Sequence, residues 1–158
     1  MKPMTHRNLD WIEQAPVKVT EERRIGVPVE NVWRAIADHE GWADWFGAIT
    51  RIERIGSGEG VGSGRRVFLK GGVKAEEEFL AWEPDARFAF VLTSSSMPGM
   101  RSMVEDVQLL PEGAGATIVR YTQAVEPAAP KIMGPVLRAA LPKGIQSGLA
   151  GLEKHLLP

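Results

Sequence analysis

The sequence predicts an α+β domain: a first strand leads into two short helices, a run of antiparallel strands follows, and one helical segment ends the chain. Three observations support this prediction. Residues 27–45 form an apolar, tryptophan-rich helical pattern that breaks once, at residues 38–41. Turn signals then divide residues 48–125 into short strand-like segments. Residues 130–157 return to helical spacing.

Composition limits the classes of function. The 158 residues suffice for one domain with one core, and 44% hydrophobic with 25% charged residues is ordinary for a globular protein. A net charge of −1 with scattered basic residues argues against nucleic acid or an anionic membrane as an obligate partner. The chain has no Cys, which excludes disulfides, thiol nucleophiles and cysteine-ligated metals. With no apolar leader and no bilayer-length segment, we expect a cytoplasmic protein without an integral membrane segment.

The first part of the chain divides into an extension and the start of the domain. Residues 1–16 are an N-terminal extension that we expect to be poorly ordered, although its apolar residues could dock onto the domain. The domain itself covers residues 17–158, and residues 17–27 are its first strand. Pro28 then suits the first turn of a helix, where a missing N–H carries no cost. The tryptophans of the two short helices either line a pocket mouth or pack in the core: Trp33, Trp42 and Trp45.

Turn residues mark the ends of the later strands. The glycine-rich run 56–64 is typical of a loop between antiparallel strands, and Gly71-Gly72 is typical of a tight hairpin turn. Residues 83–86 predict a further turn, because proline presets the backbone dihedral and aspartate bonds its own backbone. A last turn is expected at 111–115. The expected strands are 48–55, 65–71, 73–82, 87–94, 101–110 and 116–125.

The terminal helix carries an apolar stripe and a stripe of small residues. The apolar stripe recurs at i, i+4, i+7 and i+11: Ile145, Leu149, Leu152 and Leu156. Pro142 predicts a kink or break, with residues 132–141 as a separate turn or helix. The small stripe indicates either close approach of the helix to the sheet or space for a ligand beside it: Ala140, Gly144, Gly148 and Gly151.

Strand alternation predicts which side chains face the interior. Three strands have a clear apolar phase: Phe88, Phe90 and Leu92; Met103, Val107 and Leu109; Val119, Tyr121 and Val125. The second set carries Glu105 inward and the third carries Gln123. The phase of residues 73–82 is ambiguous. Buried polar groups need partners, so these residues indicate either a cavity with convergent polar groups or, for Glu105, a strand end at the surface.

Residues with catalytic potential are few. His39 is a candidate acid or base, but we favour its use as a cationic cap at the end of the first helix. The three histidines lie in separate regions, which argues against a zinc site. The serine run 94–96 lacks the context of a nucleophile elbow, and the glycine-rich loop lacks the ending of a phosphate loop. Residues 76–78, three consecutive glutamates, are expected to be mostly solvated.

The order of these segments resembles the START-like (SRPBCC) superfamily, in its polyketide cyclase/dehydrase and lipid-transport branch. The resemblance covers residues 17–157 and rests on the opening strand with VPVENVWRAIADHEGWADW, on GVGSGRRV, AWEPDARFAF and LLPEGAGATIV, and on the terminal helix ending in LEKHL. It implies a helix-grip fold, in which an antiparallel sheet wraps around a long C-terminal helix and two short helices cap a cavity. No universal catalytic motif accompanies the fold, so no catalytic residue is assigned.

Three functions are compatible with the sequence. The first is a carrier or sensor that binds an apolar small molecule, with no metal or other cofactor. The second is a polyketide cyclase or dehydratase that uses Glu105, Tyr121 and His39. The third is a regulatory protein-binding module with a vestigial cavity, and a homodimer stays open. The candidate ligand-binding residues are Trp33, Trp42, Trp45, Phe88, Phe90, Met103, Glu105, Val107, Tyr121, Gln123 and Gly148.

Overall fold

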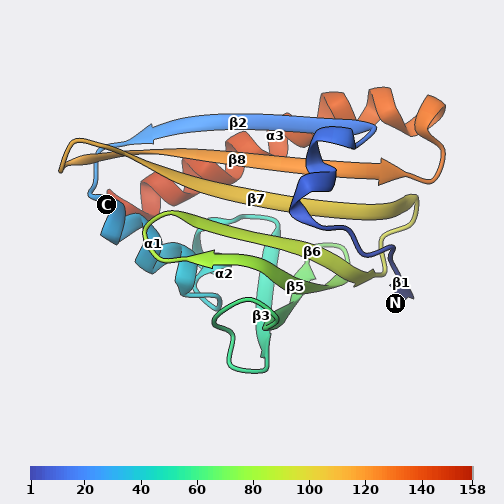
Figure 1. Cartoon of the computed structure of the whole chain (residues 1–158), viewed down its shortest axis with the longest axis horizontal. Coiled ribbons are helices and arrows are strands. Elements are labelled where there is room, and N and C mark those ends of the chain that lie inside the picture. Colours follow the sequence, from blue (N-terminus) through green and yellow to red (C-terminus); the bar gives the residue numbers. More distant parts are fainter. Residues whose placement is uncertain (158) are drawn as a thin grey trace.

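A curved antiparallel sheet partly encloses a long C-terminal helix, and the computed structural model describes residues 1–157. The sheet order is β2-β8-β7-β6-β5-β4-β3, with β1 added beside β6 (Figure 1). The strands are β1 (Lys2–Pro3), β2 (Val17–Ile25), β3 (Ile49–Ile55), β4 (Gly64–Leu69), β5 (Val73–Glu83), β6 (Arg87–Ser95), β7 (Met100–Glu112) and β8 (Ala116–Pro127). The helices are η1 (Leu9–Gln14), α1 (Val29–Ala37), α2 (Trp42–Trp45) and α3 (Pro130–Leu156). The predicted α+β helix-grip fold is confirmed.

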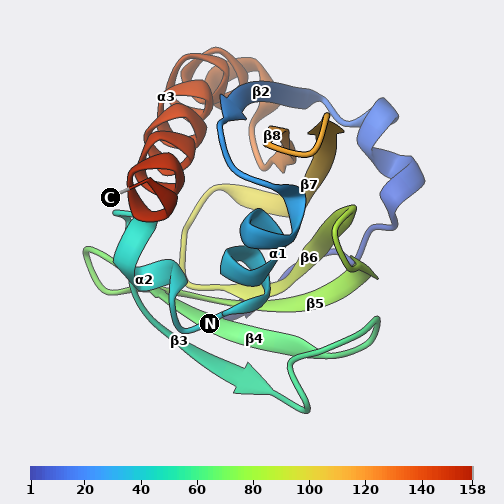
Figure 2. The ribbon, with the colours of Figure 1, turned by 90° about the vertical axis from the view of Figure 1, so that its left-hand side faces the viewer.

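Helix α3 lies on the concave side of the sheet, as Figure 2 shows. It contacts β2 and β8 on one side and the two short helices on the other. The predicted apolar stripe forms this contact, since Ile145, Leu149 and Leu152 are all buried. No helix among residues 1–157 is long and apolar enough to cross a bilayer.

The predicted break at Pro142 is wrong, because α3 is a single helix of 27 residues. A proline inside a helix removes one hydrogen bond, here the one to the carbonyl of Arg138. Arg138 is exposed, so water can bond that carbonyl. Packing of Leu137 and Leu141 before the proline, and of Ile145 after it, holds both halves of the helix against the same core.

The glycines of α3 allow close approach rather than leaving space for a ligand. A Cβ atom on Gly148 would lie 2.6 Å from the ring of Phe46, and one on Gly151 would collide with the backbone carbonyl of Trp45. Gly144, in contrast, is exposed, and a Cβ atom there would meet nothing within 4 Å. The stripe therefore lets the residues around α2 pack directly on the helix backbone.

The inward-facing residues of β6, β7 and β8 follow the predicted alternation and lie in one buried apolar cluster. The ambiguity in β5 has a structural cause, a register shift between Phe79 and Ala81 in the pairing with β6. Because of this bulge, both Phe79 and Trp82 reach the inner cluster, while Leu80 packs on the opposite face. The side-chain alternation of β5 therefore changes at the bulge, so that one set of alternate residues faces the inner cluster before it and the other set after it.

The predicted turns also form. Gly71 and Gly72 have φ values of 83° and 78°, as a tight hairpin turn requires. The Ala86 N–H donates to the Glu83 carbonyl across 2.9 Å and closes the turn at 83–86. The last turn is shorter than expected, because β7 continues through Glu112.

The N-terminal extension packs on the sheet, so the expectation of a poorly ordered segment is wrong. The Met4 N–H donates to Thr93 of β6, and the Thr5 N–H donates to Arg101 of β7, at 2.9 and 2.8 Å. These bonds join β6 and β7 beyond the end of their own pairing. Helix η1 then places Ile12 on a small apolar cluster of the convex face, on the side of the sheet opposite α3 (Figure 1). Burial of this apolar area offsets the cost of ordering the segment.

The contrast between two glycines of α3 gives a stability test. We expect Gly151→Ala to reduce the free energy of unfolding by about 1–3 kcal/mol, because the added methyl group must displace the backbone at Trp45. Gly144→Ala should increase it by about 0.5–1 kcal/mol, because alanine is the better helix former at an open position. Urea denaturation measures both. Equal effects of the two substitutions would contradict the close approach.

Candidate functional site

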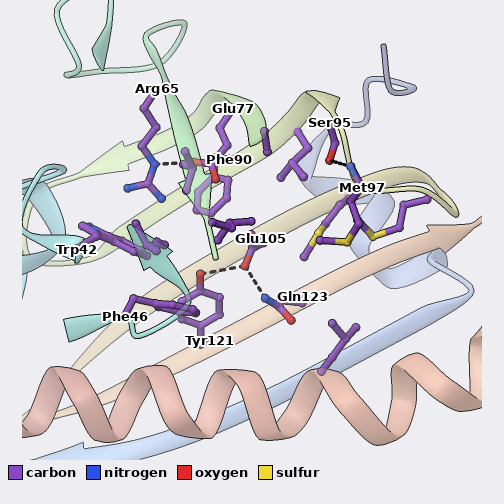
Figure 3. Close-up of a pocket in the computed structure, with 18 of the residues that line it drawn as sticks. Trp42, Phe46, Arg65, Glu77, Phe90, Ser95, Met97, Glu105, Tyr121 and Gln123 are labelled. Atoms are coloured by element: carbon purple, nitrogen blue, oxygen red, sulfur yellow. Dashed lines mark hydrogen bonds and ion pairs between the residues drawn. The ribbon is translucent and has the colours of Figure 1, made fainter. Parts of the chain in front are cut away.

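A cavity of about 210 Å³ lies between the inner face of the sheet and the first half of α3. Figure 3 shows Trp42 and Phe46 at one end, with Met97 and other sulfur-bearing side chains at the other. Met97 belongs to the loop between β6 and β7 and is 40% exposed, so this end meets the protein surface. The residues that line the cavity are Trp42, Phe46, Ile49, Arg65, Val67, Leu69, Ala75, Glu77, Phe90, Leu92, Ser95, Met97, Met100, Met103, Glu105, Tyr121, Gln123, Leu137 and Leu141.

Three polar side chains from β7 and β8 form a hydrogen-bonded group in the middle of the cavity wall (Figure 3). Glu105 and Gln123 are direct cross-strand neighbours, and Tyr121 lies two residues away on the same face. The Tyr121 hydroxyl donates to Oε1 of Glu105 at 2.9 Å, and Nε2 of Gln123 donates to the same oxygen at 2.7 Å. Strand pleating and register alone therefore bring these groups together.

The surroundings of Glu105 raise the pKa of its carboxyl group toward neutral pH. Burial is the main cause that raises the pKa of Glu105 to about 7, and the nearby Glu77 carboxyl adds to the rise. The bonds from Gln123 and Tyr121 and the charge of Arg65 act in the opposite direction. Burial, with help from Glu105, also raises the pKa of Tyr121 well above 10, so the Tyr121 hydroxyl stays protonated and remains a donor.

A buried ion pair lies on the same wall, on the neighbouring strands β4 and β5. Arg65 and Glu77 are cross-strand partners, and Nε of Arg65 donates to Oε2 of Glu77 at 2.5 Å. The two side chains are 1% and 6% exposed, respectively. Burial raises the pKa of Glu77, while the charge of Arg65 and its hydrogen bond oppose that rise. Removing either partner alone would leave an uncompensated buried charge, at a cost of about 3–5 kcal/mol.

Aromatic rings and a histidine complete the surroundings of Arg65. The guanidinium carbon lies 4.2 Å from the ring centroid of Trp42 and 5.0 Å from that of Phe90, which is cation–π geometry. Nη1 of Arg65 also donates to Nδ1 of His39 at 3.3 Å. The positive charge is therefore held between a carboxylate, an imidazole and ring faces, without contact to bulk water.

His39 is neither a cationic helix cap nor a lining residue of the cavity. It is completely buried, and its Nε2–H donates to the Gly58 carbonyl at 2.7 Å, while Nδ1 accepts from Arg65. Burial lowers the pKa of His39 to about 4, and the charge of Arg65 contributes. The imidazole is therefore neutral near pH 7, which contradicts the favoured capping role, and it acts on the cavity only through Arg65.

Six of the eleven predicted site residues line the cavity and five do not. Those that line it are Trp42, Phe90, Met103, Glu105, Tyr121 and Gln123. The other five pack in the core or on α3: Trp33, Trp45, Phe88, Val107 and Gly148. Trp33 stacks edge-on against Trp82, with ring centroids 5.1 Å apart. Gly148 contributes by admitting the ring of Phe46, which does line the cavity.

The sequence reasoning missed the ion pair and the cavity mouth. Alternation in 65–71 places Arg65, Val67 and Leu69 on one face, but a charged residue beginning a strand after a glycine-rich loop gives no reason to expect burial. The sequence also offers no clear prediction for Glu77, because it leaves open which alternate residues of β5 face inward. Met97 at the mouth and Leu137 of α3 lie in segments without strand periodicity, so no alternation pointed to them. Among residues 1–157, no three His, Cys, Asp or Glu side chains gather as metal ligands would.

The fold and this cavity define a helix-grip domain of the START-like class. The chain belongs to the family described as polyketide cyclase / dehydrase and lipid transport, whose model matches residues 16–157. An uncharacterised protein of Mycobacterium tuberculosis is 28% identical over 98% of this chain and 93% of its own length. A START superfamily protein from Mycobacterium smegmatis has a TM-score of 0.75 at 14% identity, covering 88% of this chain and 96% of that one. The ZhuI aromatase/cyclase from Streptomyces sp. R1128 has a TM-score of 0.72 at 18% identity, covering 88% and 92%.

The raised pKa of Glu105 predicts a pH-dependent difference in stability between the protein and its Glu105→Gln variant. A folded-state pKa of about 7 lies above the unfolded value near 4.5, so the proton stabilises the folded state below pH 4.5. This contribution is lost as the pH rises through 7, and amounts to about 3 kcal/mol. The difference between the two proteins in the free energy of unfolding should therefore change by this amount between pH 4.5 and 8.

Urea denaturation at several pH values measures this difference. The lowered pKa of His39 makes the opposite contribution: it stabilises the folded state above pH 6.5, and this stabilisation is lost as the pH falls through 4. The contribution is present in both proteins and cancels in the difference. A constant difference across the range would show that Glu105 titrates normally.

Proposed function

We propose that this protein reversibly binds an apolar small molecule in the cavity between the sheet and α3, as a carrier or sensor. The observation that supports the proposal most directly is the cavity itself, an apolar space with a few convergent polar groups inside an otherwise packed core. Empty space in a core is destabilising, because the atoms around it lose their packing partners. A bound apolar molecule would restore those contacts.

The size of the cavity favours a compact ligand. Engineered cavities of about 150 Å³ bind benzene, and pockets for drug-sized molecules measure about 300–1,000 Å³. At about 210 Å³ this cavity is suited to a molecule of one or two rings or to a short chain. The methionines that line the cavity, Met97, Met100 and Met103, have flexible side chains that can adapt to ligands of different outline.

A thermal-shift panel with a cavity-filling variant tests this proposal. Ala75 lines the cavity, so Ala75→Leu should occupy part of the ligand space. For the parent protein we expect at least one medium-chain alcohol or bicyclic terpenoid to raise Tm by about 5–10 °C at a hundredfold excess over Kd. Ala75→Leu should reduce that shift by more than half.

The matched control is the same substitution at Ala139, which is exposed on α3 and does not line the cavity. Ala139→Leu should keep the full shift. If no compound shifts Tm, or if both variants respond like the parent protein, binding in this cavity is wrong.

A second candidate function is a cyclase or dehydratase reaction on a poly-β-carbonyl substrate. Glu105 favours it, because a carboxyl with a pKa of about 7 inside a cavity is suited to general acid–base catalysis at neutral pH. Of the three groups that the sequence suggested for this chemistry, Glu105 and Tyr121 line the cavity and His39 does not. Turnover would be distinguished from binding by a product with a new chromatographic retention, which has the mass of the starting compound after cyclisation alone and has lost one water after dehydration. A filled core with an exposed apolar patch would favour a protein-binding role with a vestigial cavity, and the cavity between the sheet and α3 gives that role less support than the other two.

A further inference from the structure

The polar wall of the cavity offers hydrogen-bond acceptors, and most of its donors are already used. The Tyr121 hydroxyl and Nε2 of Gln123 both donate to Oε1 of Glu105. Neither bond uses Oε2 of Glu105. Among residues 1–157, the only fully buried side-chain nitrogen or oxygen without a partner is the indole nitrogen of Trp45. Oε2 of Glu105 has no partner either, so it is not fully buried and is accessible from the cavity that Glu105 lines.

Arg65 is less suited than Glu105 to bind a polar group of a ligand. Its Nε is bonded to Glu77 and its Nη1 to His39, and the ring of Trp42 covers its guanidinium group. Arg65 lines the cavity as well, but with 1% of its side chain exposed it presents little surface to a ligand. Glu105, at 8% exposure, presents more surface there. The second carboxyl oxygen of Glu105 is therefore an accessible acceptor that can carry a charge, beside the neutral amide oxygen of Gln123, which the bond to Glu105 also leaves unused.

We propose that Oε2 of Glu105 selects apolar ligands that carry one hydroxyl group, an alcohol or phenol, which donates a hydrogen bond to this oxygen. This inference rests on the proposed binding function and names its ligand class. A hydroxyl suits the site better than an ammonium group, because burying a cation among apolar side chains is costly.

The protonation state of Glu105 gives the selection a pH dependence. Because Oε1 already accepts two hydrogen bonds, a proton bound to this carboxyl is placed on Oε2 and points into the cavity. The ionised carboxylate accepts a charge-assisted bond from a hydroxyl, whereas the protonated form donates to a carbonyl. The charged and titratable groups that face Glu105 are Arg65 from β4, Glu77 from β5 and Tyr121 from β8. Leu137 and Leu141 of α3 also line the cavity and add no charge.

Three bicyclic compounds of one skeleton test this inference: tetralin, 2-tetralol and 2-tetralone. None of them changes its charge between pH 6 and 8, so any pH dependence comes from the protein. At pH 8 we expect 2-tetralol to bind at least tenfold more tightly than tetralin in calorimetric titrations. Its affinity should fall about tenfold at pH 6, as the ionised fraction of a group with a pKa of about 7 falls. The affinity of 2-tetralone should change in the opposite direction, and that of tetralin should stay constant.

The Glu105→Gln variant keeps the shape of the side chain and removes the titration. In this variant the affinities should no longer depend on pH, and 2-tetralol should lose most of its advantage over tetralin. The opposite responses of alcohol and ketone in the parent protein provide a test even if the variant does not fold. Equal binding of all three compounds at both pH values would overturn the inference and leave the proposed function standing. Absence of binding by all three would overturn the inference, and only failure of the whole thermal-shift panel as well would overturn the proposed function.

Discussion

The buried charges on the concave face of the sheet are the constraint on which the interior depends. Strand pleating turns Arg65, Glu77 and Glu105 toward α3, and each of them needs compensation there because bulk water does not reach it. Arg65 and Glu77 compensate each other, with His39 and the ring of Trp42 around the cation. Glu105 is compensated by two neutral donors and by a raised pKa of about 7. A hydrophobic interior of the same volume would often be equally stable or more so, which leaves ligand recognition as the reason we propose for these charges.

The walls and ends of the cavity have different chemical properties. The polar groups of β4, β5, β7 and β8 occupy one wall, while aromatic rings close one end and methionines form the other (Figure 3). Helix α3 contributes leucines to the opposite side, and its glycines let Phe46 and the backbone of Trp45 pack against it. The domain therefore combines a rigid closed end, an adaptable mouth and one accessible carboxyl oxygen. This arrangement suits a compact apolar molecule with a single polar group.

Sequence reasoning reached the fold and six of the nineteen residues that line the cavity, and its failures have physical causes. Glu105, Tyr121 and Gln123 were predictable because a strand period of two forces them onto the apolar face of β7 and β8. Glu77 was not, because a bulge lets β5 use both phases. Pro142 was overestimated as a helix breaker, since packing on both sides holds α3 together. For Gly148 the sequence left close approach and ligand space open, and the ring of Phe46, far away in the sequence, occupies that space; local sequence does not encode such contacts.

Native mass spectrometry of gently purified protein, followed by solvent extraction of any bound compound, shows directly whether the cavity holds a ligand. We expect a reproducible adduct of low mass that organic solvent releases, with a largely apolar skeleton of one or two rings or a short chain and one hydroxyl group. An adduct should be weaker or absent in the Ala75→Leu variant, whose cavity is smaller. A protein that stays free of adducts, even after incubation with an excess of such compounds, would contradict a ligand-binding cavity.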